Sequence, residues 1–249
     1  MSSEFNSIVD AATRPYAGAG RYAYHFTRGK LRRDPVFRAL LQGGLLPDQG
    51  QLLDLGCGLG VLPALLLEAR NQYRADNWPS GWPAPPQKLY LHGVELLGWK
   101  VEVANTALGD KASIQQGDIR TADFPPCSVV IILDVLMYMQ PTEQRLVLQR
   151  VAQSLPAGGV LLLREANAAG GWRFHVTRLA EQMLSLLRVQ GWPSLHYRSE
   201  TEWIALLEEM GFSVDTNNTL ANGVPLLIGM HSTEKPNSSS SPTHSDWLL

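Results

Sequence analysis

The chain has 249 residues, of which 45% are hydrophobic, and a formal net charge of −2. This length and apolar content suffice for one α/β domain with a full core, and the slightly acidic balance gives no general attraction to nucleic acid. The chain has only two cysteines, which excludes a disulfide framework or a cysteine-rich zinc site.

The first 47 residues precede the first predicted strand and are rich in aromatic and basic side chains. They contain no apolar core of a signal peptide, and no apolar run in the chain approaches the ~20 residues of a membrane span, so we expect a cytoplasmic protein. Because every predicted strand lies after Pro47, we also expect the rest of the chain to fold without residues 1–30.

Within this segment, residues 21–38 read RYAYHFTRGKLRRDPVFR, with six cations against one acid. One interpretation is an amphipathic helix with a solvated basic face. The other is a lid whose aromatic side chains cover an aromatic or acyl substrate while its cations, Lys30, Arg32 and Arg33 among them, meet a carboxylate or the phosphopantetheine of a carrier. His25 is then the candidate base, since imidazole titrates near neutral pH, although a purely structural histidine is also open.

The most informative segment is QLLDLGCGLGVLPALLL at residues 51–67. An apolar run ends in Asp54, alternating glycines follow, and helix-forming residues come next, which predicts the strand, turn and helix that begin a βαβ unit. The glycines leave room for a ligand against the backbone, beside the free N–H groups of a helix N-terminus. Cys57 lies within this turn, where a small packed residue is expected. The three glycines are Gly56, Gly58 and Gly60.

Strand and helix patterns then alternate, which predicts a mainly parallel sheet. Predicted strands are residues 88–94, 112–115, 128–133, 160–163, 212–214 and 224–228. Predicted helices are residues 99–108, a helix opened by Pro141, and a helix opened by the capping box of Ser199 and Glu202. The proline-rich residues 71–87 predict a surface loop, and residues 232–249 predict a disordered tail. We therefore divide the chain into a lid segment (1–47), a main domain (48–231) and a tail.

With Asp54 two residues before the glycines, this segment resembles motif I of the class I S-adenosylmethionine (SAM)-dependent methyltransferases, and the resemblance covers roughly residues 52–230. It implies SAM as cofactor and a doubly wound, mainly parallel seven-stranded sheet of order 3-2-1-4-5-7-6. The N-terminal segment, expected as a helical lid, also resembles that of methyltransferases encoded with aryl-polyene pigment pathways, which would favour a phenolic acceptor.

The resemblance implies a role for each acid at a strand end. Glu95 would accept both ribose hydroxyls, and Asp54 would help to hold the methionine amine. Asp118 would accept from the adenine amino group with Ile119 on the ring, or would form an Asx turn. Asp134 would border the sulfonium and the substrate, or would cap the next turn. The expected cofactor residues are Asp54, Gly56, Cys57, Gly58, Gly60, Glu95, Leu96, Asp118, Ile119 and Asp134.

Departures from other branches of the family narrow the function. Asp134 is followed by Val-Leu-Met, not by the Pro-Pro-aromatic sequence of amino-group nucleic-acid methyltransferases. Glu165 lacks the second glutamate of protein-arginine enzymes and the Asp-Asn pair of metal-dependent catechol enzymes. We therefore expect a metal-independent enzyme that methylates a small-molecule or carrier-bound metabolite, with aromatic and carboxylate-bearing acceptors both open.

The candidate catalytic residues are His25 and Tyr138, with His175 as a further candidate. Two other functions remain open: a catalytically silent methyltransferase fold that acts as a binding subunit, and an NAD-dependent oxidoreductase. The second is disfavoured because Val61 stands where a dinucleotide-binding loop needs its third glycine.

Overall fold

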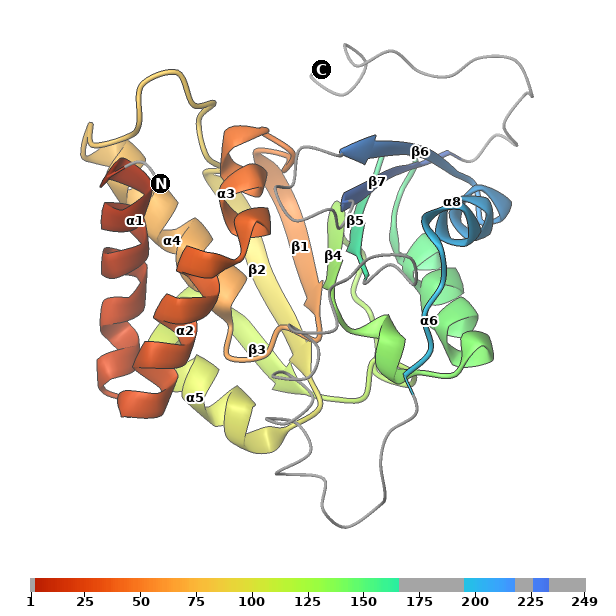
Figure 1. Ribbon diagram of the computed structural model, residues 1–249, viewed down its shortest axis with the longest axis horizontal. Helices are drawn as coiled ribbons and strands as arrows, with labels where there is room; N and C mark the ends of the chain where they lie inside the picture. Colours follow the sequence, from red (N-terminus) through yellow and green to blue (C-terminus); the bar gives the residue numbers. More distant parts are fainter. Residues whose placement is uncertain (1–2, 166–194, 218–225, 233–249) are drawn as a thin grey trace.

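The computed structural model describes residues 3–165, 195–217 and 226–232. Its centre is a seven-stranded sheet of order β3-β2-β1-β4-β5-β7-β6, which confirms the predicted order (Figure 1). Strand β7 pairs antiparallel with β5 and β6, and the other neighbours are parallel. The strands are β1 (Gln49–Leu55), β2 (Lys88–Glu95), β3 (Ser113–Gln116), β4 (Val129–Leu133), β5 (Val160–Arg164), β6 (Phe212–Asn217) and β7 (Leu226–His231). His175 and residues 233–249 of the expected tail lie outside the described part.

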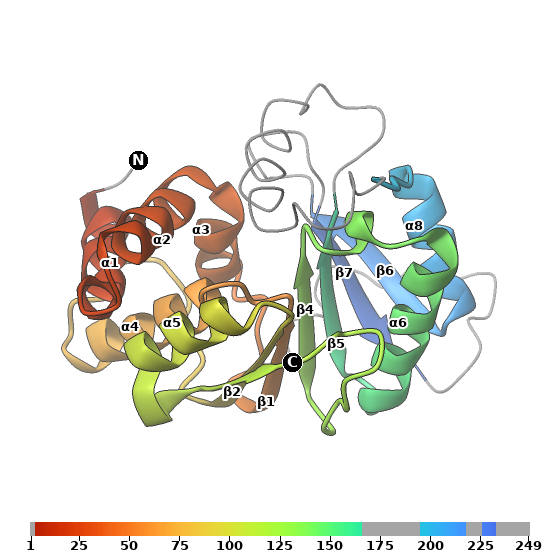
Figure 2. The same cartoon turned by 90° about the horizontal axis from the view of Figure 1, so that it is seen from below.

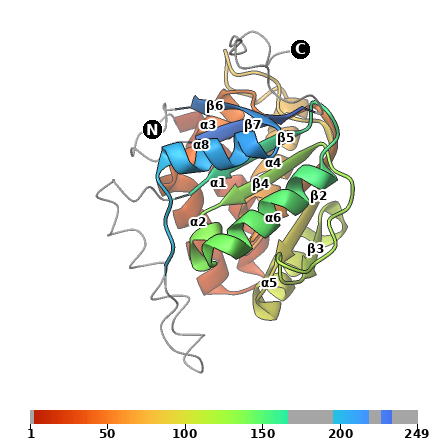
Figure 3. The same ribbon diagram turned by 90° about the vertical axis from the view of Figure 1, so that its right-hand side faces the viewer.

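Helices cover both faces of the sheet, as the edge-on view in Figure 2 shows. One face carries α1 (Ser3–Thr13), α2 (Arg21–Arg33), α3 (Pro35–Gln42), α4 (Val61–Arg74) and α5 (Gly98–Leu108). The other face carries α6 (Pro141–Ser154) and α8 (Glu200–Glu209), which run side by side in Figure 3. Short 3-10 helices are η1 (Arg14–Ala17), η2 (Gly109–Lys111) and η3 (Leu136–Tyr138).

The central strands are buried on both sides, which explains their continuous apolar sequences. Leu52 and Ile131 belong to the core under α1–α5, whereas Leu53 and Ile132 belong to the core under α6 and α8. Successive side chains of a strand point to opposite faces, so each central strand contributes to both cores. The chain runs from β1 outward to β3 and then returns to β4. This reversal leaves a crevice at the carboxyl ends of β1 and β4.

The N-terminal segment is part of the core. Phe5, Ile8, Val9 and Ala12 of α1 are buried in the same cluster as the central strands. They follow the i, i+3, i+4, i+7 spacing of one helix face, a signal that the sequence contains. The expectation that residues 1–30 are dispensable for folding is therefore corrected: it considered strands only, and these helical side chains fill one side of the core.

Two further boundaries differ from the expected ones. The basic segment forms two helices, because Asp34 adopts an extended conformation before Pro35 and caps α3 by accepting from Val36 N at 3.1 Å. Helix α4 continues to Arg74, four residues into the expected loop at 71–87. The capping box of Ser199 and Glu202 is confirmed at the start of α8. Among the described residues, no helix has the length and apolar content to cross a membrane.

Candidate functional site

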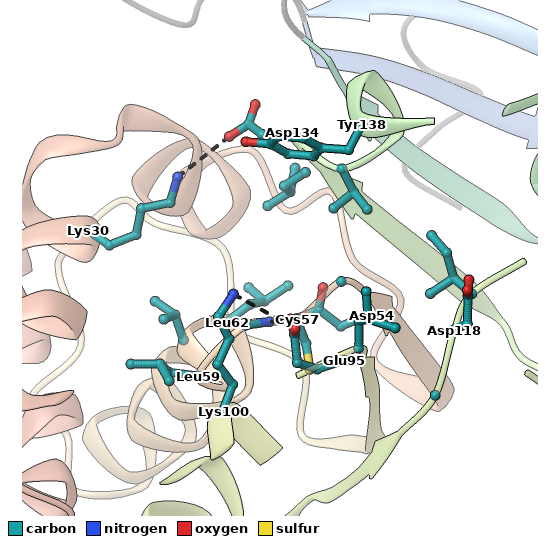
Figure 4. A pocket seen from close by; sticks show the side chains of 18 of the residues that line it. Lys30, Asp54, Cys57, Leu59, Leu62, Glu95, Lys100, Asp118, Asp134 and Tyr138 are labelled. Carbon is teal, nitrogen blue, oxygen red and sulfur yellow. Dashed lines mark hydrogen bonds and ion pairs between the residues drawn. The ribbon is translucent and has the colours of Figure 1, made fainter. Parts of the chain in front are cut away.

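A pocket of about 290 Å³ opens at the carboxyl ends of β1, β2 and β4. Its lining comes from the turn after β1, the ends of β2 and β4, the loop after β3, and helices α2 and α5 (Figure 4). One end holds Asp54, Glu95 and Lys100, and the other holds Lys30, Asp134 and Tyr138. The pocket thus lies at the reversal point of the sheet, where ligands of open α/β sheets bind.

Gly56, Cys57 and Gly58 of the glycine turn line the pocket, whereas Gly60, which was also expected to contact the cofactor, is not in the lining. Gly56 and Gly58 need glycine for different reasons. Gly56 has a φ of +74°, and a Cβ there would lie 2.5 Å from Val135. Gly58 has a φ of +59°, but a Cβ there would meet no atom within 4 Å, because it faces open space. The missing side chain of Gly58 therefore leaves room for a ligand against the backbone.

Glu95, the last residue of β2, is only 5% exposed and is oriented by two backbone donors. Gly58 N donates to its Oε2 and Leu97 N to its Oε1, both at 3.0 Å. Lys100 Nζ lies 3.7 Å from Oε1. Leu96, which follows Glu95, is exposed and lines the pocket. The carboxylate thus joins the ends of β1 and β2 at the pocket wall.

Asp54, the next-to-last residue of β1, is buried and lies beside Glu95 in the pocket wall. Burial, together with the charge of Glu95, raises the pKa of Asp54 to about 7. Cys57 is also buried, and burial raises the pKa of its thiol. A Cβ on Gly93 would lie 2.7 Å from Cys57 Sγ, so this thiol packs against β2. Cys57 is thus a packed side chain that also lines the pocket, and its expected contact with the cofactor stays a prediction.

Asp118 and Ile119 follow β3 and line the pocket at its side. Asp118 forms the Asx turn that the sequence left open, since its Oδ1 accepts from Arg120 N at 2.9 Å. The Arg120 side chain also binds this carboxylate, and these hydrogen bonds lower the pKa of Asp118. Ile119 is buried, with its side chain in the core. Although Asp118 forms an Asx turn, it still lines the pocket, so it can also contact a ligand.

Asp134 lies beyond β4 in a left-handed conformation, with a φ of +60°, and does not cap the next turn. That role belongs to Glu165: its carboxylate accepts from Val135 N at 2.8 Å, Leu136 N at 2.6 Å and Met137 N at 3.2 Å. Burial raises the pKa of Glu165 to about 8, with the charge of Asp134 adding to the effect and the three N–H groups opposing it. The capping alternative for Asp134 is therefore wrong.

Tyr138 lines the pocket beside Asp134 (Figure 4). Its hydroxyl is buried and has no hydrogen-bond partner among the described residues. Burial raises the pKa of Tyr138, and the nearby carboxylates add to the shift. The hydroxyl is therefore neutral and can donate a hydrogen bond to a ligand. Trp99 Nε1, in another lining residue, is likewise buried without a partner in the described structure.

Helix α2 presents one face to the pocket, and the lining residues Tyr22, Phe26 and Lys30 repeat every four residues on it. The buried residues Ala23, Thr27 and Leu31 form the neighbouring stripe. The sequence placed Lys30 among the six cations of the lid without singling it out, although this spacing within residues 21–33 could have done so. The ring of Tyr22 stacks on Phe26 at 5.8 Å, and the ring of Trp99 lies 6.2 Å from Tyr22.

The other cations of α2 do not reach the pocket lining. Arg28 and Arg32 bind Asp10 of α1 at 2.8 and 2.7 Å, and Arg33 is exposed. The expected contact of Arg32 and Arg33 with a substrate carboxylate is therefore corrected. His25 is also exposed, with its ring edge-on to Tyr24, and is not part of the lining. Of the two candidate catalytic residues, the fold brings only Tyr138 to the pocket.

Comparison with known proteins agrees with this geometry. A family model described as a methyltransferase domain matches residues 25–217. The carboxy-S-adenosyl-L-methionine synthase of Chromohalobacter salexigens is 32% identical over 117 residues, which are 45% of this chain and 38% of that protein. The chain thus spans less than half the length of this curated relative.

Solved structures share the fold. A SAM-dependent methyltransferase from Methanosarcina mazei matches with a TM-score of 0.53 and 17% identity, over 77% of this chain and 97% of that one. Human N-acetylserotonin methyltransferase, solved in complex with SAM, matches with a TM-score of 0.58 and 18% identity, over 84% of this chain and 54% of that one. Since the family model covers most of the chain and the sheet order is that of the fold, the chain belongs to the class I SAM-dependent methyltransferases.

Proposed function

We propose that this protein transfers the methyl group of SAM to a small-molecule acceptor. The observation that carries the proposal is the convergence of the glycine turn, Glu95, Asp118 and Asp134 on one pocket. Its volume of about 290 Å³ is at the lower end of the usual range for small-molecule sites. SAM, when bound, supplies a methyl group on a sulfonium that is already a good leaving group.

The residues present fit this cofactor. The open space at Gly58 admits a ligand to the backbone, and the partnerless Trp99 Nε1 offers a hydrogen-bond donor in the wall. In the part of the lining that the structure describes, carboxylates outnumber cations, with Asp54, Glu95, Asp118 and Asp134 against Lys30, Lys100 and Arg120. This balance complements the ammonium and sulfonium charges of the cofactor.

We call the part of the pocket around Asp54, Glu95 and Asp118 the cofactor end, and each of its residues has a proposed task. Glu95 accepts the ribose hydroxyls while its two backbone donors hold its orientation. Asp54 holds the methionine amine, and Asp118 accepts from the adenine amino group. Leu96 and Ile119 flank the adenine from either side. All five positions follow from the family motif, and all five line the pocket.

The opposite end, which holds Lys30, Asp134 and Tyr138, is the proposed acceptor end. It combines an apolar wall with few polar groups. Phe26 and Phe37 shield it from water, and the Tyr138 hydroxyl can donate to the acceptor atom or its neighbour. Lys30 lies between Asp34, at 2.9 Å, and Asp134, at 3.5 Å, so it is already neutralised. This environment favours an acceptor with an apolar or aromatic body and an uncharged polar group over a free carboxylate. Carrier-bound acceptors stay open, because the lining includes the partly exposed side of α2.

The first test is ligand binding. We expect SAM and its demethylated product, S-adenosylhomocysteine, to raise the melting temperature, and NAD to leave it unchanged. At a ligand concentration one hundredfold above the dissociation constant, the stabilisation should be about 2.7 kcal/mol. Thermal-shift assays with the three ligands measure this directly. A response to NAD alone would contradict the proposal and favour the oxidoreductase alternative.

The second test identifies the reaction. The full-length protein is incubated with SAM and a small-molecule extract, and mass spectrometry searches for metabolites that gain one methyl group. Cofactor binding without any such product would favour the catalytically silent alternative. A carboxylated form of SAM as product would instead indicate the reaction named for the curated relative, which its 32% identity over 117 residues makes the second candidate function.

Cofactor affinity should depend on pH through Asp54. With its pKa raised to about 7 in the free protein, Asp54 is largely protonated below that value, whereas an ammonium ligand favours the carboxylate. Affinity for S-adenosylhomocysteine should therefore fall as pH falls from 7.5 to 5.5, by at most about one log unit per pH unit. Calorimetric titration of the wild type and of Asp54→Asn tests this prediction. The variant should lose the slope, and equal slopes in both proteins would assign the dependence to another group.

A further inference from the structure

Arg164, the last residue of β5, joins two segments that are far apart in the chain. Its side chain is only 7% exposed, and it does not line the pocket. Both oxygens of Asp34 accept from its guanidinium, at 2.5 and 2.8 Å, across 130 positions of sequence. Asp134 accepts from Nε at 3.1 Å and also from Nη2. One buried cation thus binds both oxygens of each of two carboxylates. The planar guanidinium permits two such bidentate pairs at once, and an ammonium does not.

The two carboxylates come from different elements near the acceptor end, and of the two only Asp134 lines the pocket. Asp34 lies at the junction of α2 and α3, where it also binds Lys30 at 2.9 Å. Asp134 lies at the end of β4, and its backbone N donates to Arg164 O at 2.8 Å. Lys30 and Asp134 both line the pocket and lie within 3.5 Å of each other. Arg164 therefore holds in place the two residues that bound this end of the pocket.

Helix α2 needs such a link, because its main contacts are with other helical elements. It packs against α1, α3, α4 and η1, and its charged side is tied to α1 through Asp10. The Arg28 and Arg32 pairs with Asp10 are partly exposed, with side chains 29–41% accessible, whereas the Arg164 pair with Asp34 is nearly enclosed. Ion pairs in water contribute little, and enclosed ones fix geometry more strongly.

We propose that Arg164 is a positioning residue for the acceptor end of the pocket. By binding Asp34 and Asp134 together, it holds α2 against the end of β4 and fixes Lys30 and Asp134 relative to each other. The cofactor end, built on Glu95 and the glycine turn, does not depend on this link. The inference rests on the proposed methyl transfer for its effect on turnover, but its structural part can be measured without any ligand.

The test compares two acids of matched chemistry that both pair with arginine. Asp34→Asn weakens the Arg164 link, and Asp10→Asn weakens the outer pairs of the same helix. Hydrogen–deuterium exchange of the ligand-free protein reports on residues 21–33, and the acetylation rate of Lys30 by acetic anhydride reports on its confinement. Exchange should rise at least threefold in Asp34→Asn and change less than twofold in Asp10→Asn. Because Asp34→Asn also removes a direct partner of Lys30, acetylation is compared between wild type and Arg164→Lys, where it should rise at least threefold.

Binding and turnover separate this role from general destabilisation. The affinity of Asp34→Asn for S-adenosylhomocysteine should stay within about threefold of wild type, whereas the initial rate of SAM-dependent methylation of the small-molecule extract should fall at least tenfold. Arg164→Lys, which keeps the charge but loses the planar donors, should show the same pattern more weakly.

Unchanged exchange in Asp34→Asn, or unchanged Lys30 acetylation in Arg164→Lys, would overturn the inference. So would equal effects of Asp34→Asn and Asp10→Asn, or a parallel loss of cofactor affinity. Failure of the proposed function is a distinct result, because the wild type itself would then show no methylation.

Discussion

Replacing Glu95 by alanine is expected to weaken the binding of S-adenosylhomocysteine at least about tenfold while the protein stays folded. The carboxylate is 5% exposed and is the proposed acceptor for two ribose hydroxyls. Losing hydrogen bonds to a charged group costs roughly 1.5–3 kcal/mol, which corresponds to a tenfold or larger loss of affinity. Calorimetric titration of wild type and variant measures the change.

The structure adds a second reason for a large effect. Gly58 N and Leu97 N both donate to Glu95, so the alanine variant leaves two backbone donors at the pocket wall without their acceptor. Glu95→Gln keeps the side-chain volume, but its amide N–H would face one of these two backbone N–H donors. This variant should therefore also bind S-adenosylhomocysteine weakly. Glu102→Gln, on the exposed side of α5, is the matched control and should bind like wild type. Wild-type affinity in Glu95→Ala would remove Glu95 from the cofactor site.

Removing residues 1–30 is expected to abolish cooperative folding. The deletion removes the buried side chains Phe5, Ile8, Val9 and Tyr16 from the core. Each contributes about 1.5–3 kcal/mol by burial, so together they approach the 5–15 kcal/mol that stabilises a typical domain. Circular dichroism during heating should show no cooperative transition for the truncated protein. A transition at the wild-type temperature would show instead that the remaining helices form the core alone.

Two tyrosine variants test which contacts of the N-terminal segment stabilise the fold. Tyr16 is fully buried, and its hydroxyl donates to Leu59 O at 2.8 Å and to Gly60 O at 3.0 Å, directly beneath the glycine turn. Tyr16→Phe leaves these buried carbonyls without that donor and should destabilise the protein by about 1–3 kcal/mol. Tyr22 is 52% exposed, so Tyr22→Phe should stay within about 0.5 kcal/mol of wild type. Equal melting temperatures of the two variants would mean that α1 and η1 do not support the turn.

Local patterns predicted the elements well where each pattern involves residues close in sequence. The continuous apolar residues of β4, the glycine turn before α4 and the capping box before α8 are all present. The sheet order was implied by the family resemblance and is confirmed, whereas periodicity alone would have left it open. Helices were expected in the N-terminal segment, but the burial of α1 in the core was missed, because its apolar stripe lies in a segment without a predicted strand to pack on.

The cofactor end was accessible from sequence because each of its acids lies at or just after the carboxyl end of its own strand. Carboxyl ends of parallel strands meet at one edge of the sheet, so Asp54, Glu95 and Asp118 had to come together once the strands were parallel. The contacts at the acceptor end could not be predicted in this way, because they join residues far apart in the sequence. There the partners are separated by 30 positions for Glu165 and Val135, and by 130 for Arg164 and Asp34.

The sequence by itself therefore determined the family, the glycine turn and the acids at the strand ends. Only the tertiary structure decided which stripe of α2 faces the pocket, and thus that Lys30 lines it while His25 and Arg33 are exposed. It also decided that Glu165 caps η3 while Asp134 pairs with Arg164. The physical reason is that charged side chains compete for partners, and the outcome depends on distances and burial that exist only after the strands and helices have packed.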